Sequence, residues 1–557
     1  MPRSHFQGDH RGLAAAADGK FGRFGRMFED LEGPEFDREA LGDLARSMIK
    51  EDDGQFFNAA DDDENAFLPA GYTYFGQFVD HDLTLDKTSI GEAEADADAT
   101  DNFRTAALDL DCVYGNGPGS DLVMYDGDFK LRLSTHRIGT PTVSGPGHVR
   151  TQFDNRRDSS QIALIGDPRN DENVMVAQTH QAFTVLHNKI LDTPALMAQL
   201  PADNAHRSER FRRAARVARW HYQWVIVNDF LKRITMPEIY RDIVNPGGTP
   251  RIRYYPKSED VAAYPYMPIE FSAAAYRFGH SMVRPSYALN DMVGTTQAPA
   301  PHKRIPIFGG DNAGPRDDLR GFRRIPARWG IDWGYFFDLP GKPPATQQGS
   351  GTLQPAYRID TLLVDPLSHL VSPDLRQSTP IERNLAFLNL LRGSRLRLPT
   401  AEQVGAAMRA GDFPAARFPM LRPKQIWSAG SRNAAPFADQ TGDEGLDAAR
   451  DARRPFVERF AGNTPLWYYI LREAEWYGVR NSGDAPDAPD SARGHNDAQG
   501  GHYLGPIGST IVLETFLGLL LADQGSYIHQ AGWRPMTPIS SSPDTFELKD
   551  LLAWALT

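Results

Sequence analysis

The chain has 557 residues, 41% apolar and 24% charged, which is the composition of a folded globular protein rather than a disordered one. Its length predicts about three or four domains, or else one large enzyme. A formal charge of -12 argues against a nucleic-acid partner and an anionic membrane surface. The single cysteine excludes intrachain disulfides and thiolate metal clusters.

Residues 1–65 are polar, end in the acidic run Asp61 to Glu64, and predict an arm wrapped on the surface. No basic stretch followed by an apolar core opens the chain, so no secretory signal is visible. The longest apolar stretch, Ile511 to Ala522, contains Glu514 and is too short for a membrane helix. These features predict a soluble protein without a membrane span, and they leave the compartment open.

The segment Gly71–Leu83 is compatible with a helix that places Gln77, Asp80 and His81 on one face. An amide, a carboxylate and an imidazole are costly to bury without partners. The three side chains therefore either face water or surround a ligand.

The rest of the chain favours helices, and its alternating patterns, such as Asp121 to Ser134, are short. We predict a mainly α fold. The expected helices are Gln178 to Leu191, Arg207 to Ile234, Glu402 to Ala410, Leu466 to Tyr477 after a cap and a proline at 464–465, and Ile507 to Ala522. Residues 340–351 and 482–501 have the composition of loops.

Two further polar clusters are ambiguous on their own. Arg169 and Glu172 would share a face of a helix, but an acidic residue in a first turn is also ordinary. Glu270 to His280 predicts a helix with small residues on one side and a histidine at its end. A lone histidine in such a stretch is more often a core residue than a ligand.

In order and rough spacing, these three segments together resemble the animal-type haem peroxidases of the peroxidase-cyclooxygenase superfamily. The resemblance runs from about residue 70 to residue 522. It implies one large haem peroxidase domain, residues 66–557, after the arm 1–65. It further implies haem b, with His280 as the proximal iron ligand, His81 as the acid-base group, Arg169 as the stabiliser of negative charge and Gln77 in the distal pocket.

Asp80 and Glu172 match the carboxylates that form ester bonds to haem in mammalian members, so the resemblance implies a covalently held haem. The methionine that makes a third bond in some members would follow Glu172, where this chain has Asn173. Arg277 stands where oxygenating members have a tyrosine, as in the peroxidases, and we expect it to pair with a haem propionate.

The family also binds calcium beside the distal helix, and the loop from Thr105 to Asp111 resembles that site. The expected ligands are Asp82, Thr105, Ala107 through its carbonyl, Asp109 and Asp111. Without the resemblance, these aspartates would be interpreted as solvated loop residues.

The family's asparagine beside the proximal imidazole is expected after a Leu-Pro pair, which in this chain places Glu402 there with Gln403 adjacent. A capping box from Thr400 to Gln403 would occupy Gln403 and favour Glu402 as the partner of His280.

The leading functional prediction is a peroxidase that reduces hydrogen peroxide through an oxoferryl state and oxidises halides, thiocyanate or phenols. One alternative is an oxidase or dioxygenase for a larger organic or lipid substrate. Others are a non-catalytic haem protein of adhesion type and a calcium-binding interaction protein. A monomer is favoured, and the family resemblance points to an extracellular location.

Overall fold

The computed structural model describes residues 24–50, 63–85, 106–139, 149–198, 207–255, 265–293, 304–309, 318–339, 353–371, 378–411, 417–427, 456, 458–479 and 500–557. Helices dominate these parts of the chain, as predicted. They are α1 Arg38–Ser47, α2 Gly71–Leu83, α3 Asp111–Tyr114, α4 Val174–Asp192, α5 Pro194–Met197, α6 Arg207–Val225, α7 Lys232–Ile234, α8 Pro237–Val244, α10 Ile269–Ser272, α11 Leu385–Arg395, α12 Ala401–Ala410, α13 Pro423–Trp427, α15 Leu466–Tyr477, α16 Pro506–Ala522 and α17 Leu548–Leu556.

The strands are short and pair only two by two among the described residues. Strand β1 (Phe24–Gly25) runs parallel to β4 (Met267–Pro268), and β2 (Ile49–Lys50) runs parallel to β8 (Leu363–Val364). The antiparallel pairs are β3 (Glu64–Pro69) with β7 (Pro355–Tyr357) and β5 (Ser286–Tyr287) with β6 (Ile305–Pro306). The first two pairs and the packing of α1 on α11 fasten the described part of the N-terminal arm to the body of the molecule.

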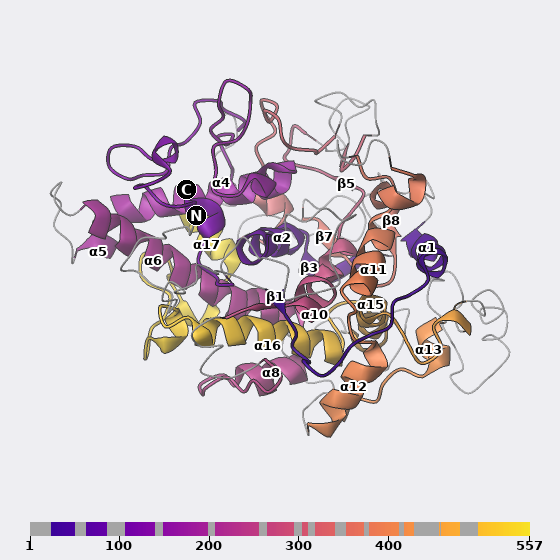
Figure 1. The fold of residues 1–557 in the computed structure, drawn as a ribbon. Coiled ribbons are helices and arrows are strands. Elements are labelled where there is room, and N and C mark those ends of the chain that lie inside the picture. The colour runs from indigo at the N-terminus through magenta and orange to yellow at the C-terminus, as the bar shows by residue number, and fades with distance from the viewer. Residues whose placement is uncertain are drawn as a thin grey trace.

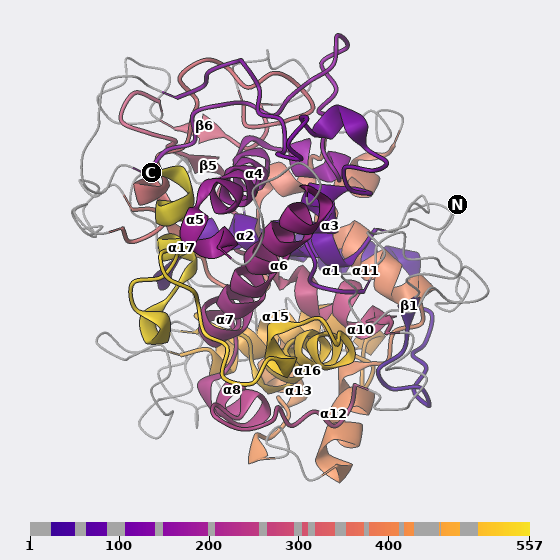
Figure 2. The ribbon, with the colours of Figure 1, turned by 90° about the vertical axis from the view of Figure 1, so that its left-hand side faces the viewer.

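The helices form two groups with α2 between them (Figures 1 and 2). On one side α4 packs against α2, α6 and α17. On the other side α16 packs against α8 and α15, and α15 packs against α11. A short 3₁₀ helix, Ala275–His280, contacts α2, α15 and α16 and so joins the two groups.

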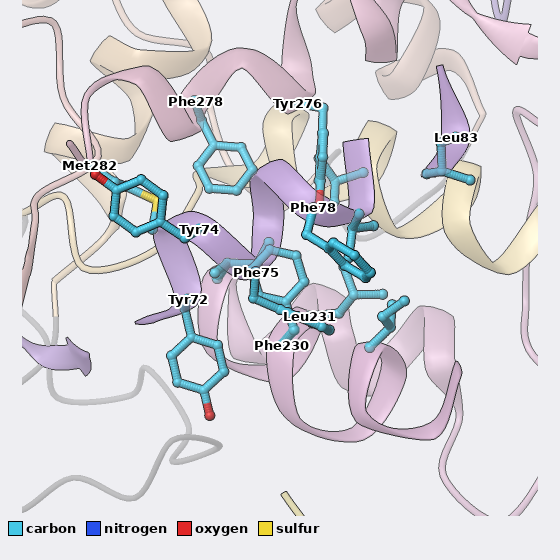
Figure 3. Packing of buried hydrophobic residues seen from close by; sticks show 14 of the residues in the cluster. Tyr72, Tyr74, Phe75, Phe78, Leu83, Phe230, Leu231, Tyr276, Phe278 and Met282 are labelled. Carbon is cyan, nitrogen blue, oxygen red and sulfur yellow. The ribbon is translucent and has the colours of Figure 1, made fainter. Parts of the chain in front are cut away.

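Helix α2 is buried on one face by aromatic packing (Figure 3). Phe75 packs edge-on against Phe230 with ring centroids 5.5 Å apart, and Phe78 stacks on Phe183 at 4.8 Å. Each such aromatic pair contributes about 0.5–1.5 kcal/mol beyond its buried area. The packing fixes the rotation of the helix, and with it the direction of the polar face that carries Gln77 and His81.

Four predicted features differ from the structure. The 207–234 helix contains a π-helical turn, Ile226–Leu231, and the 270–280 segment is divided into α10 and the 3₁₀ helix. Residues 121–134 form a 3₁₀ turn and one bridge, Tyr125 to Leu131, instead of strands. The residue that caps α15 is Pro465, one position later than predicted. Most of the two predicted loops, 340–351 and 482–501, lies outside the described residues.

Helix α16 is buried on all sides, and its acidic residue is satisfied internally. Glu514 accepts hydrogen bonds from the backbone N–H groups of Arg253 and Tyr255, both at 2.9 Å. No helix in the described ranges is long and apolar enough to cross a membrane.

A second buried carboxyl group, that of Glu473 in α15, should make the unfolding free energy of the protein depend on pH. It accepts a hydrogen bond from the backbone N–H of Ile507 at the start of α16 (2.8 Å), and burial raises its pKa to about 8. Since the folded protein holds this proton more tightly than the unfolded chain, its contribution to stability is complete below pH 4.5 and is lost as the pH rises through 8. We expect the unfolding free energy to fall by up to about 1.4 kcal/mol per pH unit in this window. Glu473→Gln should remove that slope in urea titrations at pH 5 to 9, and an unchanged slope would contradict the assignment.

Candidate functional site

A cavity of about 310 Å³ lies between α2 and the 3₁₀ helix Ala275–His280. One wall carries the expected distal residues Gln77, Asp80 and His81, together with Arg169 and Glu172. The opposite wall carries Arg277 and His280. Segments that are about 200 residues apart in the sequence therefore meet around one space.

The distal wall is held together by hydrogen bonds between α2 and the segment before α4. Gln77 Nε2 donates to Glu172 Oε1, and Gln77 Oε1 accepts from Asn173 Nδ2 at 3.0 Å. Asn173 also caps α4, because its Oδ1 accepts from the backbone N–H groups of Met175 and Val176. Asn173 thus links the start of α4 to Gln77.

Arg169 lies in a 3₁₀ turn, Pro168–Asp171, and its guanidinium is oriented by a buried carboxylate. Its Nη2 donates to Asp167 Oδ2 at 2.8 Å, to the carbonyl of His81 at 3.0 Å and to the carbonyl of Thr84. Its Nε donates to Asp167 Oδ1 at 3.2 Å. Nη1 makes no hydrogen bond to a described residue, so this end of the cation is available to a ligand.

His81 is 4% exposed and is oriented from behind by Asn170. Its Nδ1 lies 2.9 Å from Asn170 Oδ1, and its Nε2 lies 4.0 Å from Glu172 Oε1. The imidazole therefore presents Nε2 to the side on which the other cavity residues lie.

The two carboxylates of this wall are biased toward their neutral forms. Burial raises the pKa of Glu172 to about 7, nearby Asp80 raises it further, and Arg169 opposes the shift. Burial also raises the pKa of Asp80, against the opposing effects of Arg169 and Arg277. The cavity thus holds two carboxyl groups that take up protons more readily than exposed ones.

On the opposite wall, the partner of His280 is Asn389, and the prediction of Glu402 or Gln403 was wrong. Asn389 belongs to α11, is 1% exposed, and its Nδ2 lies 2.8 Å from His280 Nδ1. Arg277 Nη1 donates to Asn389 Oδ1 at 2.7 Å. Burial and the nearby Arg277 lower the pKa of His280 to about 3, so its imidazole is neutral.

Glu402 and Gln403 have structural roles instead. Glu402 accepts from the backbone N–H and the hydroxyl of Thr464, at 2.9 and 2.6 Å, and so ties α12 to the start of α15. Gln403 completes the predicted capping box, since its Oε1 accepts from the backbone N–H of Thr400 at 2.8 Å. Neither residue contacts His280 or lines the cavity.

Four residues at or behind the cavity were missed from the sequence: Asp167, Asn170, Asn389 and Arg392. Arg392 lines the cavity from α11, three residues after Asn389. A signal existed for Asn389, because it is the one amide in the apolar run from Leu385 to Leu391. Asp167 and Asn170 stand in a polar loop and carry no comparable signal.

Three of the expected calcium ligands come together behind α2. Carboxylate oxygens of Asp82, Asp109 and Asp111 lie within 4.8 Å of one another, and all three residues are buried. Asp82 Oδ2 also accepts from the backbone N–H groups of Asp109 and Leu110, both at 3.0 Å. Ala107 is buried in the same loop, whereas Thr105 lies outside the described residues.

Comparisons with known proteins show which proteins the chain is similar to. The family model "Animal haem peroxidase" matches residues 92–307, which include Arg169, Glu172 and His280. Thyroid peroxidase from Mus musculus is 27% identical over 201 residues, 33% of this chain and 20% of that protein, and the Homo sapiens protein is 31% identical over 124 residues, 22% of this chain and 12% of that protein. The matched part thus spans a fifth or less of the length of either thyroid peroxidase. Peroxidase A from Dictyostelium discoideum superposes with a TM-score of 0.54 at 13% identity, over 98% of this chain and 96% of that one.

Proposed function

The chain is a member of the animal-type haem peroxidase superfamily, and from that premise we propose that it is a haem-dependent peroxidase. It would reduce hydrogen peroxide and oxidise a small donor such as a halide, thiocyanate or a phenol. The observation that carries this proposal is the single cavity with His81 and Arg169 on one wall and the neutral imidazole of His280 on the other.

The residues of the cavity fit a haem. Iron binds an unprotonated imidazole nitrogen, and the contact with Asn389 orients the ring of His280. For Nε2 to bind iron the ring proton must lie on Nδ1, so the Asn389 amide would turn its oxygen toward Nδ1 when haem binds. Arg277 and Arg392 line the same cavity and supply cations for the two propionates. Bound between these walls, haem would supply the electron-transfer chemistry.

The distal residues would move the protons. In the proposed reaction His81 Nε2 would accept a proton from one peroxide oxygen and return it to the other, which leaves as water when the O–O bond breaks. Overall, hydrogen peroxide would take two electrons and two protons to give two molecules of water, and the electrons would come from the small donor by way of haem. Such acid-base catalysis typically contributes about 10²- to 10⁴-fold. The Nη1 end of Arg169 stabilises the negative charge on the departing oxygen. Asp167 and two backbone carbonyls hold that guanidinium in place, so little reorganisation is needed.

An oxygenating activity on a larger organic substrate is the competing function. The family resemblance puts Arg277 where oxygenating members have the radical tyrosine, and its Nε donates to the carbonyl of Ser272 at 3.0 Å. The neighbouring Tyr276 lines the cavity, but its hydroxyl donates to the carbonyl of Gly76 at 3.2 Å. These contacts favour the peroxidase.

A visible spectrum with peroxide titration tests the proposal. Protein expressed with haem should show a Soret band that changes with one equivalent of hydrogen peroxide and returns when iodide or a phenol is added. Absence of the band, or substrate-dependent oxygen uptake without added peroxide, would contradict it.

We further propose that Asp80 and Glu172 hold the haem through ester bonds. Both carboxyl groups line the cavity, where a haem methyl group could meet them. In each bond the carboxyl oxygen would be the nucleophile and would replace one hydrogen of the methyl group, while hydrogen peroxide would take up the two electrons and two protons that are released. After reaction with peroxide, acid acetone should leave the pigment on the protein. The double variant Asp80→Asn, Glu172→Gln should release it, and quantitative release from the unmodified protein would end this proposal.

We also propose calcium as the ligand of the Asp82, Asp109 and Asp111 cluster, because three buried carboxylates suit a hard divalent cation. Calcium at about 100 times its dissociation constant should raise the unfolding free energy by about 2.7 kcal/mol. Asp111→Asn should abolish most of this gain in denaturant titrations with and without EGTA. Asp128→Asn, at an exposed acid, should keep it. Equal responses of the two variants would refute the assignment.

A further inference from the structure

Asn170 is a completely buried amide between two histidines that belong to different helices. Its Oδ1 lies 2.9 Å from Nδ1 of His81 in α2, and its Nδ2 lies 3.2 Å from Nδ1 of His180 in α4. All three residues are less than 5% exposed. In a buried polar chain of this kind, a member without a hydrogen-bond partner is costly.

The direction of the Asn170 amide determines which nitrogen of each imidazole carries the proton. The oxygen of Asn170 can only accept, so His81 must carry its proton on Nδ1 and leave Nε2 unprotonated. The amide nitrogen can only donate, so Nδ1 of His180 must be an acceptor. Burial lowers the pKa of His180 to about 4, which keeps this ring neutral and able to accept.

The turn that carries Asn170 is itself fixed on both sides. The backbone N–H of Asn170 donates to the carbonyl of Asp167 at 3.0 Å. Asp171, the next residue, accepts two 2.6 Å hydrogen bonds from Arg157. The amide therefore has little freedom to move away from His81.

We propose that Asn170 is a positioning residue that holds His81 in the tautomer that carries its proton on Nδ1 and none on Nε2, and that His180 sets the direction of the Asn170 amide. The inference rests on the proposed function, since it explains how His81 is ready to take a proton from a ligand in the cavity. It assigns a role to two residues that do not line the cavity.

Two ligands separate this positioning role from general damage. Hydrogen cyanide must give up a proton to a base when it binds ferric haem, whereas carbon monoxide binds ferrous haem without proton transfer. In Asn170→Leu, which keeps the side-chain volume, we expect the cyanide dissociation constant to rise and the kcat/KM for peroxide to fall, each about 10- to 100-fold. Carbon monoxide affinity and Soret intensity should stay within twofold of the unmodified protein.

Further variants keep the test decisive if the leucine variant does not fold. Asn170→Asp retains an oxygen that accepts from His81 and should preserve cyanide affinity, because the buried carboxyl group can carry a proton on the oxygen that faces Nδ1 of His180. His180→Phe removes the anchor of the amide and should weaken cyanide binding several-fold. The control is His187→Gln: His187 is an equally buried histidine two turns further along α4, and it contacts Tyr114 instead (3.2 Å). This control should leave cyanide affinity unchanged.

The outcomes distinguish the inference from the proposed function. If the unmodified haem-loaded protein binds cyanide and consumes peroxide while Asn170→Leu or His180→Phe does both equally well, the positioning role is wrong and the peroxidase stands. Parallel losses of cyanide and carbon monoxide binding would also overturn it, because they indicate a collapsed cavity. If the unmodified protein binds neither ligand, the proposed function itself fails.

Discussion

His280→Ala is expected to give a folded protein that purifies without bound haem and consumes peroxide only at the uncatalysed background rate. His280 is the imidazole on the wall opposite His81, it is neutral, and its ring is oriented by Asn389. Removing it takes away the proposed bond between protein and iron, which no neighbouring side chain in this wall can replace. The measurement is the Soret absorbance per protein, together with the rate of peroxide loss.

A glycine substitution at the same position tests whether the lost haem binding can be restored. His280→Gly leaves space for a free imidazole, so adding imidazole should restore the Soret band and part of the activity. The control His369→Ala changes a histidine that is 66% exposed and should leave both quantities unchanged. Full pigment content and activity in His280→Ala would refute the assignment of the axial ligand.

The fold was predictable where hydrophobic periodicity is long and strong. The expected helices at 178–191, 402–410, 466–477 and 507–522 correspond to α4, α12, α15 and α16 within a few residues. The division of the segment 270–280 was not predictable, because its run of alanines gives no sign of the break between α10 and the 3₁₀ helix. Tertiary contacts with α15 and α16 determine that geometry, and a local pattern does not contain them.

The site was predictable to the extent that its residues fall into compact motifs. Gln77, His81, Arg169 and His280 were located from the sequence, and the structure brings them around one cavity. The predicted partner of His280 is wrong because the Leu-Pro pair at 398–399 does not mark the position of the residue that contacts the imidazole. The buried Asn389 lies nine residues before Leu398, in an apolar helix where only the three-dimensional contact reveals its role.

A second set of residues that could not be predicted from the sequence holds the turn Pro168–Asp171 in position. Arg157 donates to both oxygens of Asp171 at 2.6 Å and also binds Asp154 through Nε at 3.0 Å. The side chains of all three residues are 5% exposed or less. Asp171 directly follows Asn170, so this buried triad determines where the distal turn lies. Nothing in the spacing of 154, 157 and 171 distinguishes it from a set of surface charges.

Arg157→Met should therefore destabilise the protein by about 3–5 kcal/mol, because it leaves two buried carboxylates without their shared cation. The matched control is Arg38→Met, which removes an exposed ion pair with Glu382 and should cost less than about 1 kcal/mol. Burial already raises the pKa of Asp171 against the opposing effect of Arg157. Without the arginine the folded-state pKa rises further, so the deficit should be large at pH 7 and shrink as the pH falls toward 5. Urea titrations at both pH values measure this, and a deficit that does not depend on pH would show that lost packing, rather than the unpaired carboxylates, causes it.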